Sequence, residues 1–310
     1  MNVKTNPVLY LSFVLSAAAG AGVLGLRLDS LFACQAAGYG PDRYLAYCQA
    51  TNYGDYDHGA FWFGLERAAL DAAANADVLF LGNSRMQFGL STDATADWFS
   101  SSSTSYYLLG FSHNGNYMFE APLLRKLHPR AKAYVINVDL FFEQSETPPA
   151  KAVMRDVGAE ARYRQKERWQ SVHNLICMRV PSACRDEIAF FRSRTTGAWR
   201  VTGGQLEGGP VSYNANVNEA TVRTYAAAGN TFLSDLPVNR ACVILTTVPT
   251  TTTNIGTAKA IAAAVGLNLV APQLDGLRTF DGSHLDRASA ERWSRAFIQA
   301  AGSTLDLCVG

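Results

Sequence analysis

Apolar and amphipathic segments alternate along the chain from about residue 60 to its C-terminus. Short runs that are apolar on both faces, as in buried parallel strands, cover residues 78–81, 105–109, 133–138, 241–246 and 267–270. Helical patterns lie between them or follow them, at residues 61–74, 117–127, 261–265 and 288–301. This order predicts an α/β fold, a doubly wound three-layer sandwich with a parallel sheet covered by helices on both sides.

Two segments do not follow this alternation of strands and helices. Residues 28–59 are rich in Gly, Tyr, Asp and Cys and have no sustained period, which predicts a linker or collar. His58 in this segment, near Asp55 and Asp57, is expected in a solvated loop rather than at a metal site. Residues 150–238 form an insertion, charged at first and then Gly-rich, which is interpreted either as a solvated face or as a cap over a ligand site.

The N-terminal segment, residues 1–27, is predicted to direct export. Residues 7–26 contain no charge before Arg27, and such a run is long enough to cross the roughly 30 Å hydrocarbon layer as a helix. A cleaved signal is the alternative, because Ala17, Ala19 and Ala21 offer small-residue cleavage sites. We therefore expect a single-pass inner-membrane protein with residues 60–310 in the periplasm, or an exported protein if the signal is cleaved.

Cysteine usage favours the same compartment. Six cysteines allow 15 complete pairings, and proximity in the sequence favours Cys34–Cys48 and Cys177–Cys184, leaving Cys242 with Cys308. Buried free thiols are the alternative. Because no Cys-x-x-Cys pair occurs, a zinc site is not expected, and we expect neither a metal nor a cofactor.

Composition limits the partners. The 310 residues, 48% of them hydrophobic, are enough for one sizeable core. With 27 Lys and Arg against 26 Asp and Glu, the formal net charge is +1, so no overall basic field exists to bind nucleic acid.

Candidate chemistry lies in two segments far apart in the sequence. Ser84 follows the first predicted strand in a Gly-Asn-Ser turn, where a strand passes into a helix. Asp281 and His284 lie three residues apart, just before the last helix. A hydroxyl, a base and a carboxylate are the groups that nucleophilic acyl transfer requires. His113, after the second strand, competes with His284 as the base.

In these two motifs the chain resembles the SGNH hydrolases, also called GDSL-like esterases. Gly82-Asn83-Ser84 and the Asp-x-x-His motif ending at His284 stand in the family's order, and the resemblance covers about residues 76–302. It implies a flavodoxin-like SGNH-type sheet and a catalytic triad of Ser84, Asp281 and His284. It also implies an oxyanion hole built from the N–H groups of Ser84 and Gly110.

The third sequence block departs from the family pattern. Where SGNH proteins carry Gly-x-Asn-Asp, this chain has Asn137-Val138-Asp139, and alternation points Asn137 into the sheet. Asn114 or Asn116 is then the candidate for the remaining oxyanion donor. Arg85 has two interpretations, a partner of an acidic neighbour that fixes the turn or a site for an anionic substrate group.

An N-terminal helix with a variant third block resembles the membrane-anchored members that modify cell envelopes. This implies a serine esterase or O-acyltransferase acting on acyl esters, in particular acetyl esters, of an extracytoplasmic glycan or on a small acyl ester, in some cases beside a membrane-bound O-acyltransferase. The alternative is an inactive member of the same fold that binds a glycan or serves as a scaffold for that acyltransferase.

Overall fold

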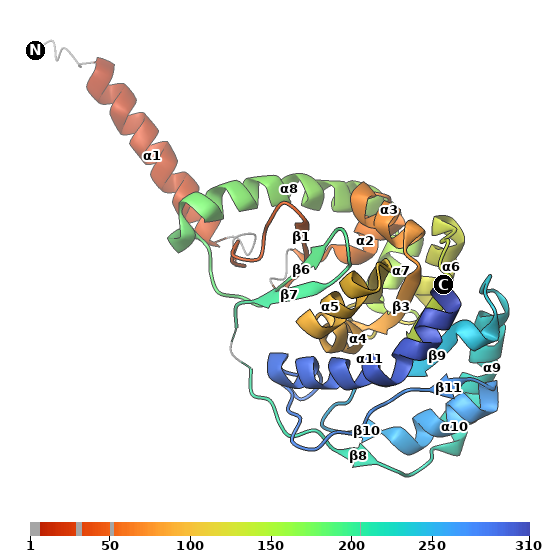
Figure 1. Ribbon diagram of the computed structural model, residues 1–310. Coiled ribbons are helices and arrows are strands. Elements are labelled where there is room, and N and C mark those ends of the chain that lie inside the picture. Colours follow the sequence, from red (N-terminus) through yellow and green to blue (C-terminus); the bar gives the residue numbers. More distant parts are fainter. Residues whose placement is uncertain (1–6, 29–32, 50–52, 205) are drawn as a thin grey trace, which may run out of the picture.

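Five parallel strands form the central sheet of the computed structural model, which describes residues 7–28, 33–49, 53–204 and 206–310 (Figure 1). They are β3 (Val78–Asn83), β4 (Tyr106–Phe111), β5 (Ala133–Asn137), β9 (Val243–Thr246) and β11 (Asn268–Leu269). Their order across the sheet is β11-β9-β5-β3-β4. Numbered along the chain and read from β4, this is 2-1-3-4-5, the doubly wound order of flavodoxin-like sheets. The predicted parallel sheet is confirmed.

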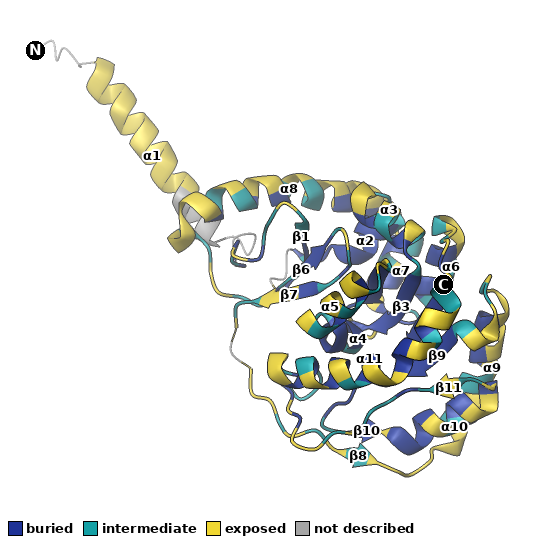
Figure 2. Cartoon of the chain, in the orientation of Figure 1, coloured by how far each residue is buried: buried dark blue, intermediate teal, exposed yellow. Residues whose placement is uncertain are grey.

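Alternate residues of each strand enter two separate hydrophobic clusters. In β3, Leu79 and Leu81 pack into one cluster, whereas Val78 and Phe80 pack into the other. The first cluster is covered by α3 (Arg67–Asn75), α6 (Tyr117–Leu127), α9 (Glu219–Ser234) and α10 (Ile255–Val265). The second is covered by α4 (Ser84–Leu90), α5 (Asp93–Ser101) and α11 (Arg287–Val309). Buried positions therefore line the sheet side of the helices, and helices cover both faces as predicted (Figure 2).

Helix boundaries follow local chemistry that the apolar pattern alone does not reveal. The helix predicted at residues 61–74 is two helices, α2 (Asp57–Trp62) and α3, because Gly64 between them has a φ of +69°. α10 starts six residues before the predicted 261, where the Asn254 side chain accepts a hydrogen bond from the Thr257 N–H. It ends at Gly266, whose φ is +66°.

The linker interpretation of residues 28–59, one of the two offered beside a collar, is wrong, because residues 43–48 and 54–55 are strands of a second sheet. This antiparallel sheet has the order β2-β1-β6-β7. Its strands are β1 (Arg43–Cys48), β2 (Gly54–Asp55), β6 (Ala189–Ser193) and β7 (Trp199–Thr202). Residues 33–49 and 53–55 thus fold together with the first part of the insertion, which includes β6, β7, α8 (Ala159–Arg179), the 3-10 turn η2 (Pro181–Ala183) and most of α7 (Pro148–Arg155) (Figure 1).

The rest of the insertion packs α9 against the central sheet and contributes one strand to a separate two-stranded sheet. A short strand β8 (Tyr213–Asn214) pairs in parallel with β10 (Thr253–Asn254), and the turn η3 (Arg240–Cys242) leads into β9.

Buried polar groups join the second sheet to the edge strand β4. The Arg192 guanidinium is fully buried, lies 2.8 Å from the Asp57 carboxylate, and donates to the carbonyl oxygens of Leu108 and Gly110. The Leu108 N–H donates to the Thr196 carbonyl at 2.9 Å. These bonds satisfy backbone groups that an open sheet edge would expose.

His58 is fully buried rather than solvated, which corrects the sequence-based expectation. Its Nδ1 lies 3.0 Å from Asp55 Oδ2, and its ring contacts those of Phe111 and Phe119. Asp55 Oδ2 also accepts a hydrogen bond of 2.8 Å from Ser112 Oγ, in the loop after β4. The residues around His58 therefore form a structural link between the two sheets.

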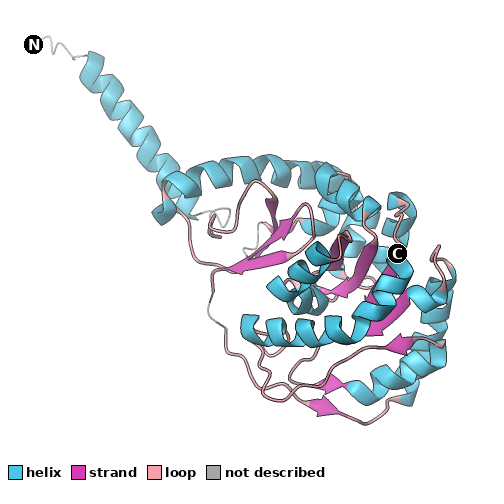
Figure 3. Cartoon of the chain, viewed as in Figure 1, coloured by secondary structure: helices cyan, strands magenta, loops and turns pink. Residues whose placement is uncertain are grey.

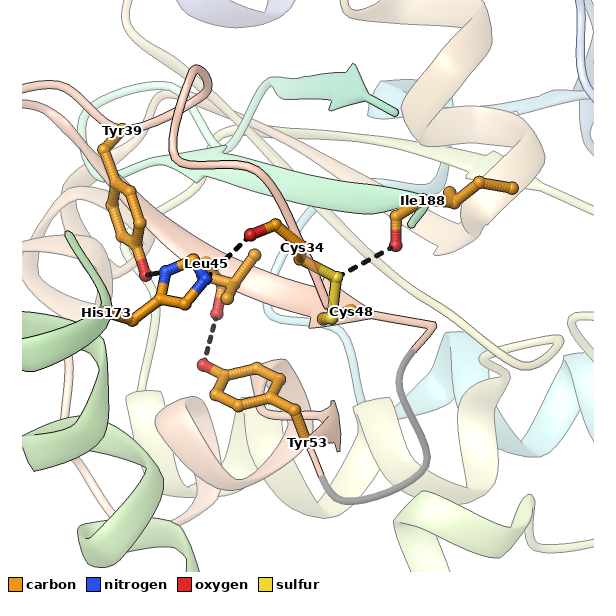
Figure 4. The surroundings of a disulfide bond; sticks show 7 residues. All are labelled: Cys34, Tyr39, Leu45, Cys48, Tyr53, His173 and Ile188. Atoms are coloured by element: carbon orange, nitrogen blue, oxygen red, sulfur yellow. Dashed lines mark hydrogen bonds between the residues drawn. A yellow bond between two sulfur atoms is a disulfide. The ribbon is translucent and has the colours of Figure 1, made fainter. Parts of the chain in front are cut away.

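All three expected disulfides are present, Cys34–Cys48, Cys177–Cys184 and Cys242–Cys308. Around the first, His173 bonds through Nε2 to the Cys34 carbonyl and through Nδ1 to the Tyr39 hydroxyl (Figure 4). The third ties the end of α11 to the start of β9, 66 residues earlier in the sequence.

Helix α1 (Pro7–Leu28) extends away from the rest of the chain, and its residues 7–22 are exposed (Figure 3). Within the described residues, none of the helices has the length and apolar character needed to cross a membrane. The first six residues of the predicted anchor segment lie outside the described residues.

We expect the disulfides to differ in their contribution to stability. In the chain-entropy view, the 66-residue separation of Cys242 and Cys308 gives about 4 kcal/mol, and the 7-residue separation of Cys177 and Cys184 about 2 kcal/mol. Urea unfolding of the Cys242→Ser/Cys308→Ser and Cys177→Ser/Cys184→Ser variants measures how much each disulfide contributes to the free energy of unfolding. Equal losses would contradict the expected order.

Acid should weaken the link between the sheets. Burial raises the pKa of Asp55, but the charge and hydrogen bond of His58 and the bond from Ser112 outweigh it and bring the pKa to about 2. Since this lies below the unfolded value of 3.8, the carboxylate stabilises the fold above about pH 4, by about 2 kcal/mol, and loses this effect as the pH falls through about 2. The stability difference between wild type and Asp55→Asn, measured by urea unfolding, should shrink over that window.

The exposed residue Asp97 provides the control. Asp97→Asn should stay within about 0.5 kcal/mol of wild type at neutral pH. A difference between wild type and Asp55→Asn that stays constant from pH 6 to pH 2 would contradict the account.

Candidate active site

The nucleophile turn lies at the carboxyl end of β3, where the doubly wound sheet changes direction. β3 ends at Asn83, and α4 begins at Ser84, whose exposed fraction is only 9%. Gly82 has a φ of +148°, and a Cβ there would approach Asn137 Cβ to 3.0 Å. Glycine at this position therefore permits both the backbone conformation and the close contact between β3 and β5.

The base and the acid share one tight turn before α11. Asp281 Oδ1 accepts the backbone N–H groups of Ser283 and His284, at 2.9 and 2.7 Å. Asp281 Oδ2 lies 2.6 Å from His284 Nδ1. Because the carboxylate accepts the Nδ1 proton, Nε2 is left as the acceptor nitrogen of the neutral ring.

The structure brings the three predicted residues together. Ser84 Oγ lies 2.8 Å from His284 Nε2, although the two residues are 200 positions apart in the sequence. Serine, histidine and aspartate thus form one continuous chain of hydrogen bonds. This is the geometry in which an imidazole can take a proton from a serine hydroxyl.

The environment keeps Asp281 ionised. Partial burial raises the pKa of its carboxyl, but the hydrogen bond and charge of His284, together with the two backbone N–H groups, lower it below the ordinary value. The imidazole is held in place by aromatic rings, with the Phe88 centroid 4.7 Å and the Phe280 centroid 5.6 Å from its own.

A network of side-chain amides, which the sequence did not suggest, fixes the turn that carries Ser84. Asn83 Oδ1 accepts the Arg85 N–H at 3.0 Å and so caps α4, and it also accepts Asn137 Nδ2 at 3.2 Å. Asn83 Nδ2 donates to the Asp139 carbonyl, while Asn137 Oδ1 accepts the Val248 N–H. Asn137 is fully buried, so it stabilises the turn from the neighbouring strand and does not face a ligand.

Arg85 connects the two segments that carry Ser84 and His284. Its Nε donates to Ser283 Oγ at 3.0 Å, within the turn that carries His284, and its guanidinium pairs with the Asp139 carboxylate. Of the two interpretations of Arg85, the structure bears out the pairing with an acidic neighbour. This contact resists separation of the Ser84 and His284 segments.

A buried carboxyl lies behind the nucleophile turn. Glu120 of α6 is fully buried and accepts the Gly82 N–H at 3.3 Å. Burial is the main cause that raises its pKa well above the ordinary value, so the neutral acid is favoured. Glu120 thus provides a polar contact to the strand without adding a negative charge behind the turn that carries Ser84.

The three candidate oxyanion donors lie in different structural settings. The Ser84 N–H stands at the first position of α4, where helix N–H groups have no partner within the helix. Gly110 lies within β4 rather than at its end, opposite Gly82, and a Cβ there would come within 2.8 Å of the Asn83 carbonyl. Asn114 is exposed in the turn after β4 with a φ of +57°. Its role and that of Gly110 as donors stay predictions.

Two other sequence candidates have different roles. Asn116 is the N-cap of α6, where its side chain accepts the Met118 N–H and donates to the Ser145 carbonyl. His113 bonds to Ser112 Oγ and contacts the Tyr47 ring. In the structure, His284 and not His113 is hydrogen-bonded to Ser84.

Two cavities flank the catalytic segments. A small one of about 160 Å³ is lined by Arg85 and by residues of the segment 250–254, which the sequence left open as a pocket border or a plain loop. A larger one of about 530 Å³ lies on the side of Phe88 and Phe280. Among the described residues, the one group with metal-ligand spacing is His173, Cys177 and Cys184, but the two sulfur atoms form a disulfide.

Comparisons with protein-family models, curated proteins and solved structures found no match to this chain. The resemblance to SGNH hydrolases therefore rests on the motifs and the geometry of this chain alone.

The amide network predicts a large effect of removing Asn137. Asn137→Ala leaves the buried Val248 N–H without its acceptor and removes a donor from Asn83, so the free energy of unfolding should fall by about 1–3 kcal/mol. Asn75→Ala, which removes an exposed asparagine bonded to the Asp71 carbonyl, should change it by less than about 0.5 kcal/mol. Similar urea midpoints for the two variants would contradict the role of Asn137.

Proposed function

We propose that this protein is an extracytoplasmic serine esterase or O-acyltransferase of the SGNH type, acting on acyl esters, most simply acetyl esters, of a cell-surface glycan. The observation that supports this proposal is the continuous chain of hydrogen bonds from Ser84 through His284 to Asp281, with heavy-atom distances of 2.8 and 2.6 Å. Its position at the switch point of a doubly wound sheet, where ligands bind in this architecture, agrees with it.

In the proposed mechanism, Ser84 Oγ attacks the ester carbonyl while His284 Nε2 accepts its proton. The Asp281 carboxylate holds the Nδ1 proton and stabilises the imidazolium that forms. Negative charge on the carbonyl oxygen is stabilised by the Ser84 N–H at the start of α4, with Gly110 and Asn114 as further candidates. The imidazolium then donates its proton to the leaving alcohol, which gives an acyl ester on Ser84.

The acceptor in the second half-reaction determines the type of enzyme. Water gives hydrolysis, and a sugar hydroxyl gives transfer; in both, His284 removes the proton of the incoming hydroxyl. The Arg85 contact to Ser283 would keep the base within reach of the acyl ester throughout both steps.

Location outside the cytoplasm is part of the proposal. Three disulfides are typical of oxidising compartments, and the exposed apolar helix α1 suits an export segment, either retained in the inner membrane or cleaved. A membrane-bound O-acyltransferase is the proposed partner that would supply or receive the acyl group.

One observation favours the second candidate function, a catalytically inactive glycan-binding or scaffold protein. Both polar atoms of the Asn137 amide are engaged, with Asn83 and Val248, so the third block contributes no side-chain donor to an oxyanion. Loss of one such donor typically costs about 10² to 10³ in rate, which leaves a slower enzyme rather than none. The esterase is therefore the preferred function.

Covalent labelling distinguishes the two functions. A fluorophosphonate probe should label the full chain, and Ser84→Ala and His284→Ala should abolish labelling and lower the hydrolysis of a small acetyl ester by about 10⁴-fold or more. Ser303→Ala, an exposed serine on α11, is the control and should label normally. A well-folded wild-type chain that takes no label would support the inactive scaffold.

A further inference from the structure

The larger cavity is a groove beside Phe88 and Phe280, the two rings that contact His284. It has a volume of about 530 Å³, within the range typical of ligand sites, and is far larger than an acetyl group needs. Aromatic rings of Phe88, Trp199 and Phe280 and three arginines, Arg43, Arg200 and Arg287, are among its lining residues. We call it the aromatic groove.

Two of these rings connect the aromatic groove directly to His284. The ring of Phe280 is stacked on the imidazole, and the ring of Phe88 is tilted against it, with centroid distances of 5.6 and 4.7 Å. Leu285, the residue after His284, also lines the groove. Two rings in the wall of the groove therefore also pack against the imidazole of His284.

The aromatic groove is lined by more arginine than carboxylate side chains. Among the described residues, no carboxylate lies within 4.0 Å of the guanidinium groups of Arg43 or Arg200. Arg287 lies 3.5 Å from Asp93, but the exposed fractions of these side chains are 92 and 80%, so the pair is weak.

The other carboxylate of the aromatic groove already has partners. Glu291 pairs with Arg295 at 2.9 Å and accepts the Ala94 N–H at 3.0 Å. The groove therefore offers guanidinium groups that no carboxylate of the described chain neutralises, although the whole protein has a net charge of only +1.

Its wall also has an unused hydrogen-bond donor. The Trp199 side chain is 6% exposed, and its Nε1 has no acceptor among the described residues. A buried donor without a partner is unfavourable, so Trp199 leaves one polar atom of this wall unsatisfied.

We propose that the aromatic groove binds an acidic polysaccharide whose sugar residues carry carboxylates, and that it thereby presents an ester of that chain to Ser84. Guanidinium groups pair with carboxylates through charge-assisted, often bidentate hydrogen bonds, and the partly exposed ring of Phe280 provides apolar contact area for a sugar ring. This inference rests on the proposed function for the ester that is presented. Binding of the polysaccharide itself depends only on the groove.

Binding to two polyuronates, polygalacturonate and hyaluronate, tests the inference with the full chain in non-ionic detergent. Calorimetry should show that at least one of them binds about tenfold or more tightly than its carboxyl-reduced, neutral form. Arg43→Gln/Arg200→Gln should weaken that binding by about tenfold or more, since each charge-assisted bond accounts for about one order of magnitude.

A charge-matched control separates the groove from general attraction. Arg168→Gln/Arg223→Gln removes two exposed arginines on α8 and α9 that do not line the groove, and it should keep the wild-type affinity. Equal binding of acidic and neutral polymers, no binding of either, or equal losses in the two double variants would overturn the inference.

Fluorophosphonate labelling of the same samples keeps the two proposals distinguishable. The wild type and the Arg168→Gln/Arg223→Gln control should label at equal rates, because Arg168 and Arg223 line neither the groove nor the Ser84–His284–Asp281 site. Selective binding of the acidic polymer without labelling would support the groove and contradict the esterase. Labelling without selective binding would support the esterase and contradict the proposed role of the groove.

Discussion

The geometry of the site depends on the hydrogen bonds made by the side-chain amide of Asn83. One residue at the end of β3 caps α4, bonds to Asn137 of the neighbouring strand and holds the Asp139 backbone. The position of Ser84 is therefore set by the two central strands of the sheet and not by a free loop. A nucleophile held in this way needs little reorganisation to meet a base, which is what catalysis by positioning requires.

The second catalytic segment reaches the same place through contacts that are individually modest. Asp281 closes its turn by accepting two backbone N–H groups, Arg85 bonds across to Ser283, and Phe88 and Phe280 contact the imidazole. Each hydrogen bond to a charged group contributes about 1.5–3 kcal/mol, so their joint geometry matters more than any single one. Arg85 has a particular role, because it touches both the nucleophile segment and the base segment.

Strand and helix positions could be predicted from the sequence, because apolar runs and helical periods reflect burial directly. The candidate site residues Ser84, Asp281 and His284 could also be predicted from the sequence, since each motif combines a turn with residues of defined chemistry. The linker at 28–59 was mispredicted for a physical reason. β1 and β2 are short, and β1 pairs with β6, about 145 residues later in the sequence, so no local pattern reveals the second sheet. Alternation along the strand predicts that Asn137 points into the sheet. Its partners Asn83 and Val248 cannot be predicted in this way, because they are brought to it by the packing of neighbouring strands.

The central claim is that Ser84 forms a covalent acyl intermediate with the help of His284. The most direct measurement is peptide mass mapping of the full chain, quenched in acid during turnover of p-nitrophenyl acetate. The account predicts an acetyl group on the peptide that contains Ser84, and its absence in His284→Ala. An acetyl group on another residue, or consumption of many equivalents of ester without any acetylated Ser84 peptide, would contradict it.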